Sequence, residues 1–258
     1  MRLGIEVDID YALPVPADVL LQIEVAAQPD QRIEAEALTV WSDHPLRAVS
    51  GEDGVGQRCW AHVAGPLQAQ YRATVVVERA PLSLEGLGTT PPRHVPAALT
   101  AYLLPSRYCP VDRLWGFVQR QFSGLQGGPL AAAMADWVAR EIEYRNDGPV
   151  DTTALDTFAI RAGVCRDFAH LLVTFARAGG IPARCVSAYA PGVDPPDVHA
   201  VAELWLDGAW HLVDATGMAH ADEIARVAVG RDAVDIAFLT IFGRARLQRQ
   251  SVRVVRLG

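Results

Sequence analysis

The chain has 258 residues, of which 50% are apolar and 21% charged, and its formal net charge is −7. This length allows one large domain or two smaller ones around a real hydrophobic core, with the composition of an ordinary globular protein. The acidic balance argues against a nucleic-acid partner and against binding to an anionic membrane. No apolar run approaches the roughly 20 residues that a membrane-spanning helix needs.

The N-terminal segment and the cysteines indicate a cytoplasmic protein. Residues 1–11 carry several charges and lack the apolar stretch of a signal peptide. The cysteines form no CxxC pair and no dense framework, so we expect reduced thiols and not disulfides. There are four of them: Cys59, Cys109, Cys165 and Cys185.

Residues 1–80 follow patterns typical of antiparallel β structure. Leu3, Ile5, Val7 and Ile9 alternate with polar or small residues, as in a half-buried strand. The alternation and the turn-rich breaks after it predict a β-sandwich-like module over 1–80, which serves as a scaffold or a partner surface. Further strands are expected at 19–26, 33–41, 58–63 and 70–77.

Residues 81–100 are rich in proline and glycine, which predicts a linker. Residues 101–258 are then expected to form the second part of the protein, with Asp112 as the N-cap of its first helix. Helices are expected at 112–122 and 130–144, and strands at 183–189, 199–206 and 209–214. An apolar segment at 235–242 and a charged, alternating strand at 246–257 follow.

Cys165 begins the most informative helix of the second part. Apolar residues such as Phe168 and Phe175 recur after it at helical spacing, and Gly179 ends the pattern. Cys165 therefore lies in the first turn, where unpaired backbone N–H groups and the helix dipole favour a thiolate over a thiol. Taken alone, this residue also fits a small buried cysteine without a chemical role.

A hairpin further along the chain supplies partners for a thiol nucleophile. Residues 207–208, Asp-Gly, predict a two-residue turn that sets Trp205 opposite Trp210. In this register His199 shares a face with Asp214 as a diagonal neighbour, within side-chain reach. A loop longer by one residue would place Asp214 on the opposite face. An imidazole oriented by a carboxylate is the pair that nucleophilic thiol chemistry needs.

Several separated segments resemble the signature of bacterial transglutaminase-like cysteine proteases, in the order found in that family. The resemblance implies a papain-like α+β core in which Cys165 is the nucleophile on a helix and His199 and Asp214 lie on the sheet. Val201 departs from the family, which often has an aromatic residue two positions after the histidine. The segments are 104–109, 153–156, 163–170, 180–187, 199–200 and 210–216.

We therefore predict an α+β protein: an N-terminal antiparallel β module, and a transglutaminase-like core over 101–258. The family includes peptidases, amidases and protein-glutamine acyltransferases, so the expected substrate is a peptide, protein or amide. Hydrolysis and amine transfer both remain open, a catalytically silent binding module is the alternative, and the oligomeric state is unknown.

Cys165, His199 and Asp214 form the predicted catalytic triad, and no organic cofactor is implied. The Cys165 backbone N–H is the expected first oxyanion donor, and Tyr108 is the candidate for the second. We expect no metal, because a structural zinc site needs four ligands in close-set pairs, which Cys165, Cys185 and His199 do not provide.

Overall fold

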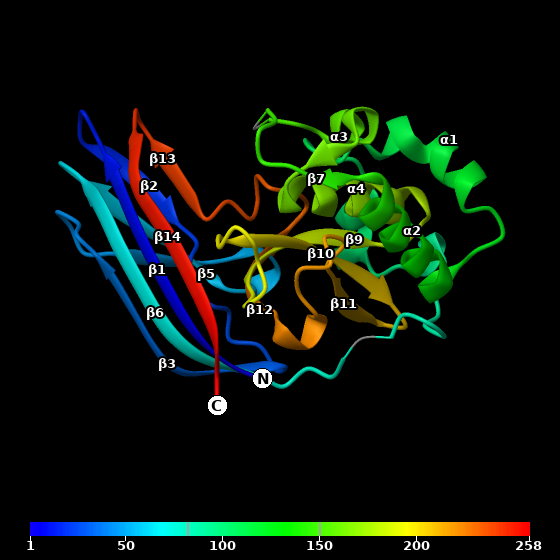
Figure 1. The fold of residues 1–258 in the computed structure, drawn as a ribbon, viewed down its shortest axis with the longest axis horizontal. Helices are drawn as coiled ribbons and strands as arrows, with labels where there is room; N and C mark the ends of the chain where they lie inside the picture. Colours follow the sequence, from blue (N-terminus) through cyan, green and yellow to red (C-terminus); the bar gives the residue numbers. More distant parts are fainter. Residues whose placement is uncertain (82, 150) are drawn as a thin grey trace.

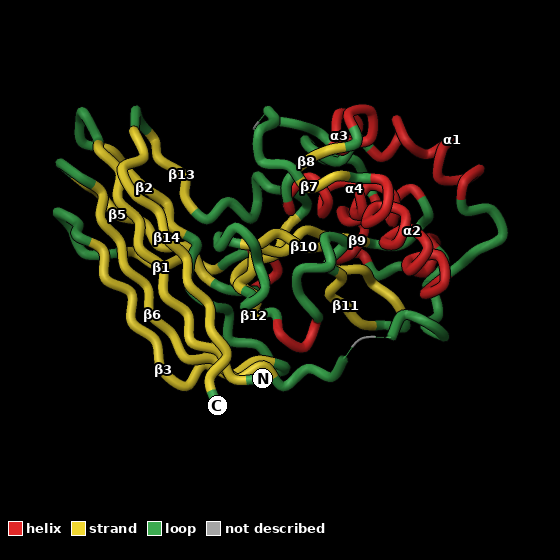
Figure 2. Tube along the Cα trace, in the orientation of Figure 1, coloured by secondary structure: helices red, strands yellow, loops and turns green. Residues whose placement is uncertain are grey.

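The computed structural model describes residues 1–81, 83–149 and 151–258 (Figure 1). It confirms the predicted α+β class: sheets stacked on one side of the molecule, and helices gathered over a further sheet on the other (Figure 2). No helix in the described part of the chain has both the length and the apolar character needed to cross a bilayer.

Two four-stranded antiparallel sheets form the β module. Leu3, Ile5, Val7 and Ile9 point into the space between them and are at most 3% exposed, as their alternation predicts. The first sheet has the order β14 (Arg246–Leu257), β1 (Arg2–Ala12), β6 (Leu67–Val77), β3 (Gln31–Val40). The second has the order β13 (Leu239–Phe242), β2 (Ala17–Leu21), β5 (Gln57–Val63), β4 (Arg47–Ser50).

The last two strands correct the predicted division of the chain. Residues 239–257 were expected in the core over 101–258, but β14 pairs with β1 along its whole length and β13 pairs with β2. The two ends of the chain therefore lie side by side (Figure 1). The alternation in β14 predicts a strand but not its partner. Pairing with β14 satisfies backbone groups of β1 that would otherwise be open at the edge of the sheet.

The second part packs helices against one side of a sheet of order β11-β10-β9-β12. Its central helix, α4, is buried at every residue from Asp167 to Ala178. Asp112, the predicted N-cap of α1, lies inside the first turn instead, because the helix already begins at Val111. The elements are α1 (Val111–Gln121), α2 (Gly127–Glu141), β7 (Glu143–Tyr144), α3 (Ala154–Ile160), β8 (Ala162–Gly163), α4 (Cys165–Ala178), β9 (Ala183–Tyr189), β10 (His199–Leu206), β11 (Ala209–Val213) and β12 (Ala225–Gly230). Short 3₁₀ segments occur at Glu52–Gly54, Pro92–His94, Ala97–Leu103 and Ala221–Glu223.

The proline-rich segment predicted as a linker lies against the second part. The carbonyl of Gly88 accepts a hydrogen bond of 2.9 Å from the backbone N–H of Asp207, in the β10–β11 turn. The carbonyl of Leu87 accepts another, of 2.8 Å, from Gly128 at the start of α2. These bonds attach the segment to the second part of the chain at the β10–β11 turn and at the start of α2.

A buried ionic network joins the β module to β10. Glu203 is fully buried and accepts hydrogen bonds from both Arg184 and Arg226. Arg226 also forms an ion pair of 2.7 Å with Asp30, and Arg184 forms one of 2.8 Å with Asp53. Both aspartates lie in connections of the β module. Although burial opposes it, hydrogen bonding to arginines, chiefly Arg226, lowers the pKa of Asp30 to about 2. The strand that begins at His199 is therefore held from both parts of the chain.

Candidate active site

The start of α4 is held by a capping carboxylate. Asp167 is 3% exposed, and its Oδ2 accepts a hydrogen bond of 2.9 Å from the backbone N–H of Val164. Its Oδ1 accepts a bond of 2.6 Å from the Thr152 hydroxyl. A Cβ on Gly163 would lie 2.6 Å from the Asp167 Cβ, so this close approach requires glycine. Together these contacts present Cys165, partly exposed, at the helix N-terminus.

The β10–β11 hairpin has the register that its turn predicts. Trp205 pairs with Trp210, and their rings lie 5.4 Å apart. Asp207 and Gly208 both have positive φ angles, of 52° and 79°, as a type I′ turn requires. The backbone twist of a type I′ turn matches the twist of the two strands that it joins. An Asp-Gly turn therefore sets which residues of these strands lie opposite each other.

The histidine and aspartate at the open end of this hairpin are in contact. His199 Nε2 lies 2.8 Å from Asp214 Oδ2, and the two side chains are 0% and 1% exposed. The carboxylate is held in turn by Thr216, whose backbone N–H and hydroxyl donate to Oδ1 at 2.9 and 2.7 Å. The backbone N–H of Ala219 donates to Oδ2 at 3.0 Å. Asp214 is thus fixed in the orientation that meets the imidazole.

Electrostatics hold His199 in its protonated form. Burial would lower its pKa, but hydrogen bonding to Asp214 and to Cys165, in that order, raises it to about 9. The same contact lowers the pKa of Asp214, although burial opposes that shift too. The other ring nitrogen, Nδ1, is buried and has no hydrogen-bond partner that meets strict geometry among the described residues. That nitrogen is therefore left for the thiol of Cys165.

Cys165 and His199 line one cleft with a volume of about 350 Å³. Ser187, on the neighbouring strand β9, belongs to the same lining. Ile236 and Phe238, from the connection between β12 and β13, complete it on an apolar side. The cleft is thus bounded partly by the segment that leads back to the β module.

The structure does not bring Tyr108 to these residues. Its ring stacks on His170 with centroids 5.2 Å apart, and its backbone N–H donates to Asp232 at 3.0 Å. Among the described residues, Tyr108 makes no hydrogen bond or ring contact with Cys165 or His199. Its role in the predicted site is therefore unsupported by the geometry.

Tyr144 lies where Tyr108 was expected. The parallel pairing of β7 with β8 sets Tyr144 opposite Gly163, two residues before Cys165. Its hydroxyl lies beside Cys165, and its ring lies 5.9 Å from that of Phe168. Burial, followed by the charge of Cys165, raises the pKa of Tyr144 to about 12. A two-residue parallel bridge leaves no periodic pattern in a sequence, so sequence reasoning had no signal for this residue.

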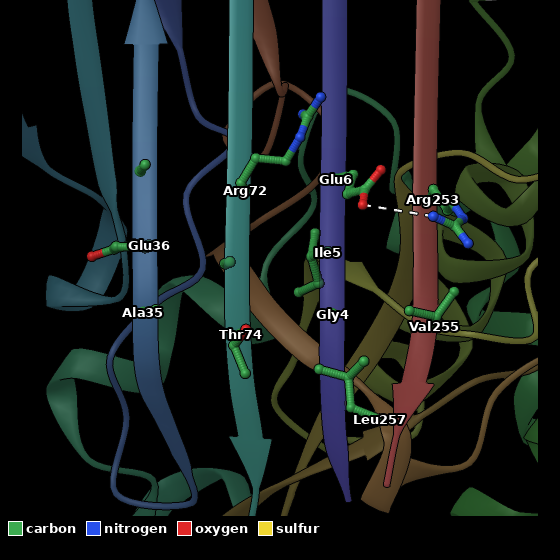
Figure 3. A pocket seen from close by; sticks show the side chains of 12 residues that line it. Gly4, Ile5, Glu6, Ala35, Glu36, Arg72, Thr74, Arg253, Val255 and Leu257 are labelled. Carbon is green, nitrogen blue, oxygen red and sulfur yellow. Dashed lines mark ion pairs between the residues drawn. The ribbon is translucent and has the colours of Figure 1, made fainter.

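The described residues include no cluster of three or more His, Cys, Asp or Glu side chains placed to hold a metal ion. A cavity of about 430 Å³ lies on the first sheet of the β module, where Glu6 and Arg253 form an ion pair of 3.6 Å (Figure 3). The described residues that line it include no cysteine or histidine, so it offers no thiol–imidazole pair.

The fold and the site define an α+β core whose central helix begins at a cysteine and whose sheet carries a histidine and an aspartate in contact. The transglutaminase-like superfamily matches residues 124–215. A crystal structure from Cytophaga hutchinsonii, described as a putative cysteine protease, is 30% identical, covers 100% of this chain and 91% of its own, and superposes with a TM-score of 0.90. The chain belongs to the transglutaminase-like superfamily.

Two other proteins are similar over part of their sequence or fold. The uncharacterized protein ML0607 of Mycobacterium leprae is 30% identical over 145 residues, which are 52% of this chain and 52% of that protein. The match therefore spans about half the length of that relative. The periplasmic domain of TgpA from Pseudomonas aeruginosa is 19% identical, with 83% of this chain and 89% of that chain covered and a TM-score of 0.41.

Proposed function

We propose that this chain is a thiol-dependent acyl-transfer enzyme that acts on peptide or amide bonds, most simply as a cysteine peptidase or amidase. Cys165 is the nucleophile, His199 the general base and acid, and Asp214 the residue that orients His199. The observation that carries the proposal is the buried His199–Asp214 contact of 2.8 Å beside the cleft that contains Cys165. Membership of the superfamily supports a cysteine-protease-like or acyltransferase activity in general.

In the first step, the Cys165 thiolate attacks the carbonyl carbon of the substrate and forms a C–S bond. Because the pKa of His199 is about 9, the imidazole holds a proton at neutral pH, and its positive charge stabilises the attacking thiolate. The Cys165 backbone N–H, at the start of α4, donates to the oxygen that becomes negative. His199 gives its proton to the leaving nitrogen, the C–N bond breaks, and an amine departs from the thioester.

In the second step, His199 takes a proton from water, and the hydroxide attacks the thioester carbonyl. The C–S bond then breaks, the carboxylic acid leaves, and Cys165 and His199 return to thiolate and imidazolium. If an amine attacks in place of water, the product is a new amide. Hydrolysis and transfer therefore use the same residues and differ only in which nucleophile reaches the thioester.

Tyr144 is the residue to which we assign the second oxyanion contact. Its hydroxyl lies beside Cys165, where the carbonyl of a substrate attacked by that residue would also lie. The raised pKa keeps this hydroxyl protonated, so it can donate a hydrogen bond at neutral pH. This assignment replaces the one made for Tyr108 from the sequence.

The function is tested by offering glutamine-containing peptides together with a labelled amine. Mass spectrometry then separates chain cleavage, deamidation and amine adducts. We expect at least one of these products with the native protein and none with Cys165→Ala. A catalytically silent binding module would give no product and no selective alkylation of Cys165.

We base a proposal for the cellular location on the state of the cysteines. All four are free, and Cys59, Cys109 and Cys185 are buried. Reduced thiols are expected in a reducing compartment, so we propose a cytoplasmic location. Fractionation of native cells with an antibody to this chain tests it, and recovery outside the cytoplasmic fraction would contradict it.

A further inference from the structure

Ser187 is a buried polar residue that the triad does not use. It lies on β9, is 2% exposed, and lines the same cleft as Cys165 and His199. Its hydroxyl has no hydrogen-bond partner among the residues that the structure describes. Buried hydroxyl groups in native proteins are normally hydrogen-bonded, because leaving one without a partner costs stability. A buried hydroxyl without a partner in the described chain, on a residue that lines a candidate substrate cleft, therefore points to a bound group that satisfies it.

The strand pairing explains why this hydroxyl has no partner on the neighbouring strands. Ser187 pairs with Ala200 on β10 and with Ala228 on β12, and neither methyl side chain can hydrogen-bond to it. Ala200 directly follows His199, which pairs with Ala188 on the same two strands. Ser187 is thus held by the backbone ladder one position away from His199.

The rest of the cleft gives Ser187 an apolar setting. Ile236 and Phe238, from the connection between β12 and β13, and Leu239, the first residue of β13, line it. Ile236 is 6% exposed, and it belongs to the hydrophobic core that both parts of the protein share. A group bound between these side chains and β9 would contact hydrocarbon on one side and a single hydroxyl on the other.

We propose that this cleft binds the substrate side chain next to the reacting carbonyl, and that this side chain has an apolar body and one hydrogen-bonding group that meets Ser187. The inference rests on the proposed function and narrows it to acyl donors with tyrosine-like or glutamine-like residues at that position. A site built to hydrogen-bond a substrate group discriminates against an analogue that lacks it, because the buried partner is then left unsatisfied. Ser187 is thereby a specificity-determining residue.

The test uses peptides that differ only at the residue before the reacting bond, in the matched pairs tyrosine and phenylalanine, and glutamine and methionine. We expect the native protein to show a higher kcat/KM for the polar member of at least one pair, by roughly 2- to 10-fold, the effect of one neutral hydrogen bond. Ser187→Ala should bring that ratio close to one. Ser50→Ala, on exposed β4, is the matched control and should keep the native ratio.

A thermal unfolding curve separates this role from a structural one. Because the Ser187 hydroxyl has no partner among the described residues, Ser187→Ala should unfold no earlier than the native protein. Equal ratios in the native protein and in Ser187→Ala would overturn the inference while leaving the proposed function standing. No turnover of any peptide, together with an unreactive Cys165, would overturn the proposed function and the inference with it.

Discussion

His199 donates a hydrogen bond from Nε2 to Oδ2 of Asp214 at 2.8 Å, from opposite strands of one hairpin and with both side chains fully or almost fully buried. The contact leaves Nδ1 as the nitrogen available to a thiol. Burial lowers the pKa of His199, but Asp214 and Cys165 together raise it to about 9, so the imidazole is protonated at neutral pH. Five predictions follow from this arrangement and from the elements that hold it.

Cys165 is expected to be the most reactive thiol at neutral pH. It is partly exposed at a helix N-terminus, whereas Cys59, Cys109 and Cys185 are at most 5% exposed. Limited treatment with iodoacetamide followed by peptide mapping measures the order of modification. Alkylation of Cys109 before Cys165 would count against the nucleophile assignment.

Substitution of the orienting carboxylate should lower turnover without unfolding the protein. Asp214→Ala removes the acceptor and should reduce kcat by about 10- to 10³-fold, whereas Asp214→Asn keeps one oxygen and should retain more activity. His199→Ala deletes the acid and base and should cost more than either. Steady-state kinetics with circular dichroism as the folding control checks the order. Equal activity of His199→Ala and the native protein would exclude the mechanism.

Activity should fall on the alkaline side as pH rises through about 9. The pKa of His199 is raised, so its proton is present below that value and is lost above it, together with the imidazolium–thiolate pair. A profile of kcat/KM between pH 6 and 10.5, an interval chosen to bracket that pKa, measures this limb. In Asp214→Asn the limb should move to lower pH, because the charge that raises the pKa is gone. An alkaline limb that does not move would show that another group titrates there.

One extra residue in the Asp207–Gly208 turn should be as damaging to activity as loss of the Asp214 carboxylate. The insertion changes which side chains share a face, so Asp214 no longer meets His199. An alanine inserted after Gly124, in the exposed connection between α1 and α2, is the control and should leave turnover near the native value. Comparison of the kinetic constants of the two insertion variants tests whether activity depends on the register of this turn. Full activity of the turn variant would contradict the register argument.

Glu203→Ala should be strongly destabilising. It leaves Arg184 and Arg226 buried without their shared carboxylate, and breaking a buried ion pair on one side typically costs about 3–5 kcal/mol. Glu78→Ala removes an exposed pair of 3.7 Å and should change the unfolding free energy by less than about 1 kcal/mol. Urea unfolding of the two variants measures the difference. Similar values for both would show that the network contributes little.

Much of the local structure was predictable, because it depends on patterns within a few residues. The alternation of Leu3, Ile5, Val7 and Ile9 predicts β1, and the helical spacing after Cys165 predicts α4. The Asp-Gly turn at 207–208 predicts the β10–β11 register, which brings His199 and Asp214 to one face. The superfamily was also recognisable, since its motifs occur in order along the chain.

Other features were decided only by contacts between distant segments. The pattern of 246–257 predicts a strand, but only the folded chain shows that it pairs with β1 and forms one edge of the first sheet. Tyr144 reaches Cys165 through a two-residue bridge, and Tyr108 is instead stacked on His170. Ser187 lies between two alanines of neighbouring strands, a setting that no local window of sequence contains. The spacing of apolar residues determines which face of a helix or strand is buried. Which strand or side chain it contacts depends on burial and hydrogen bonding across the whole chain.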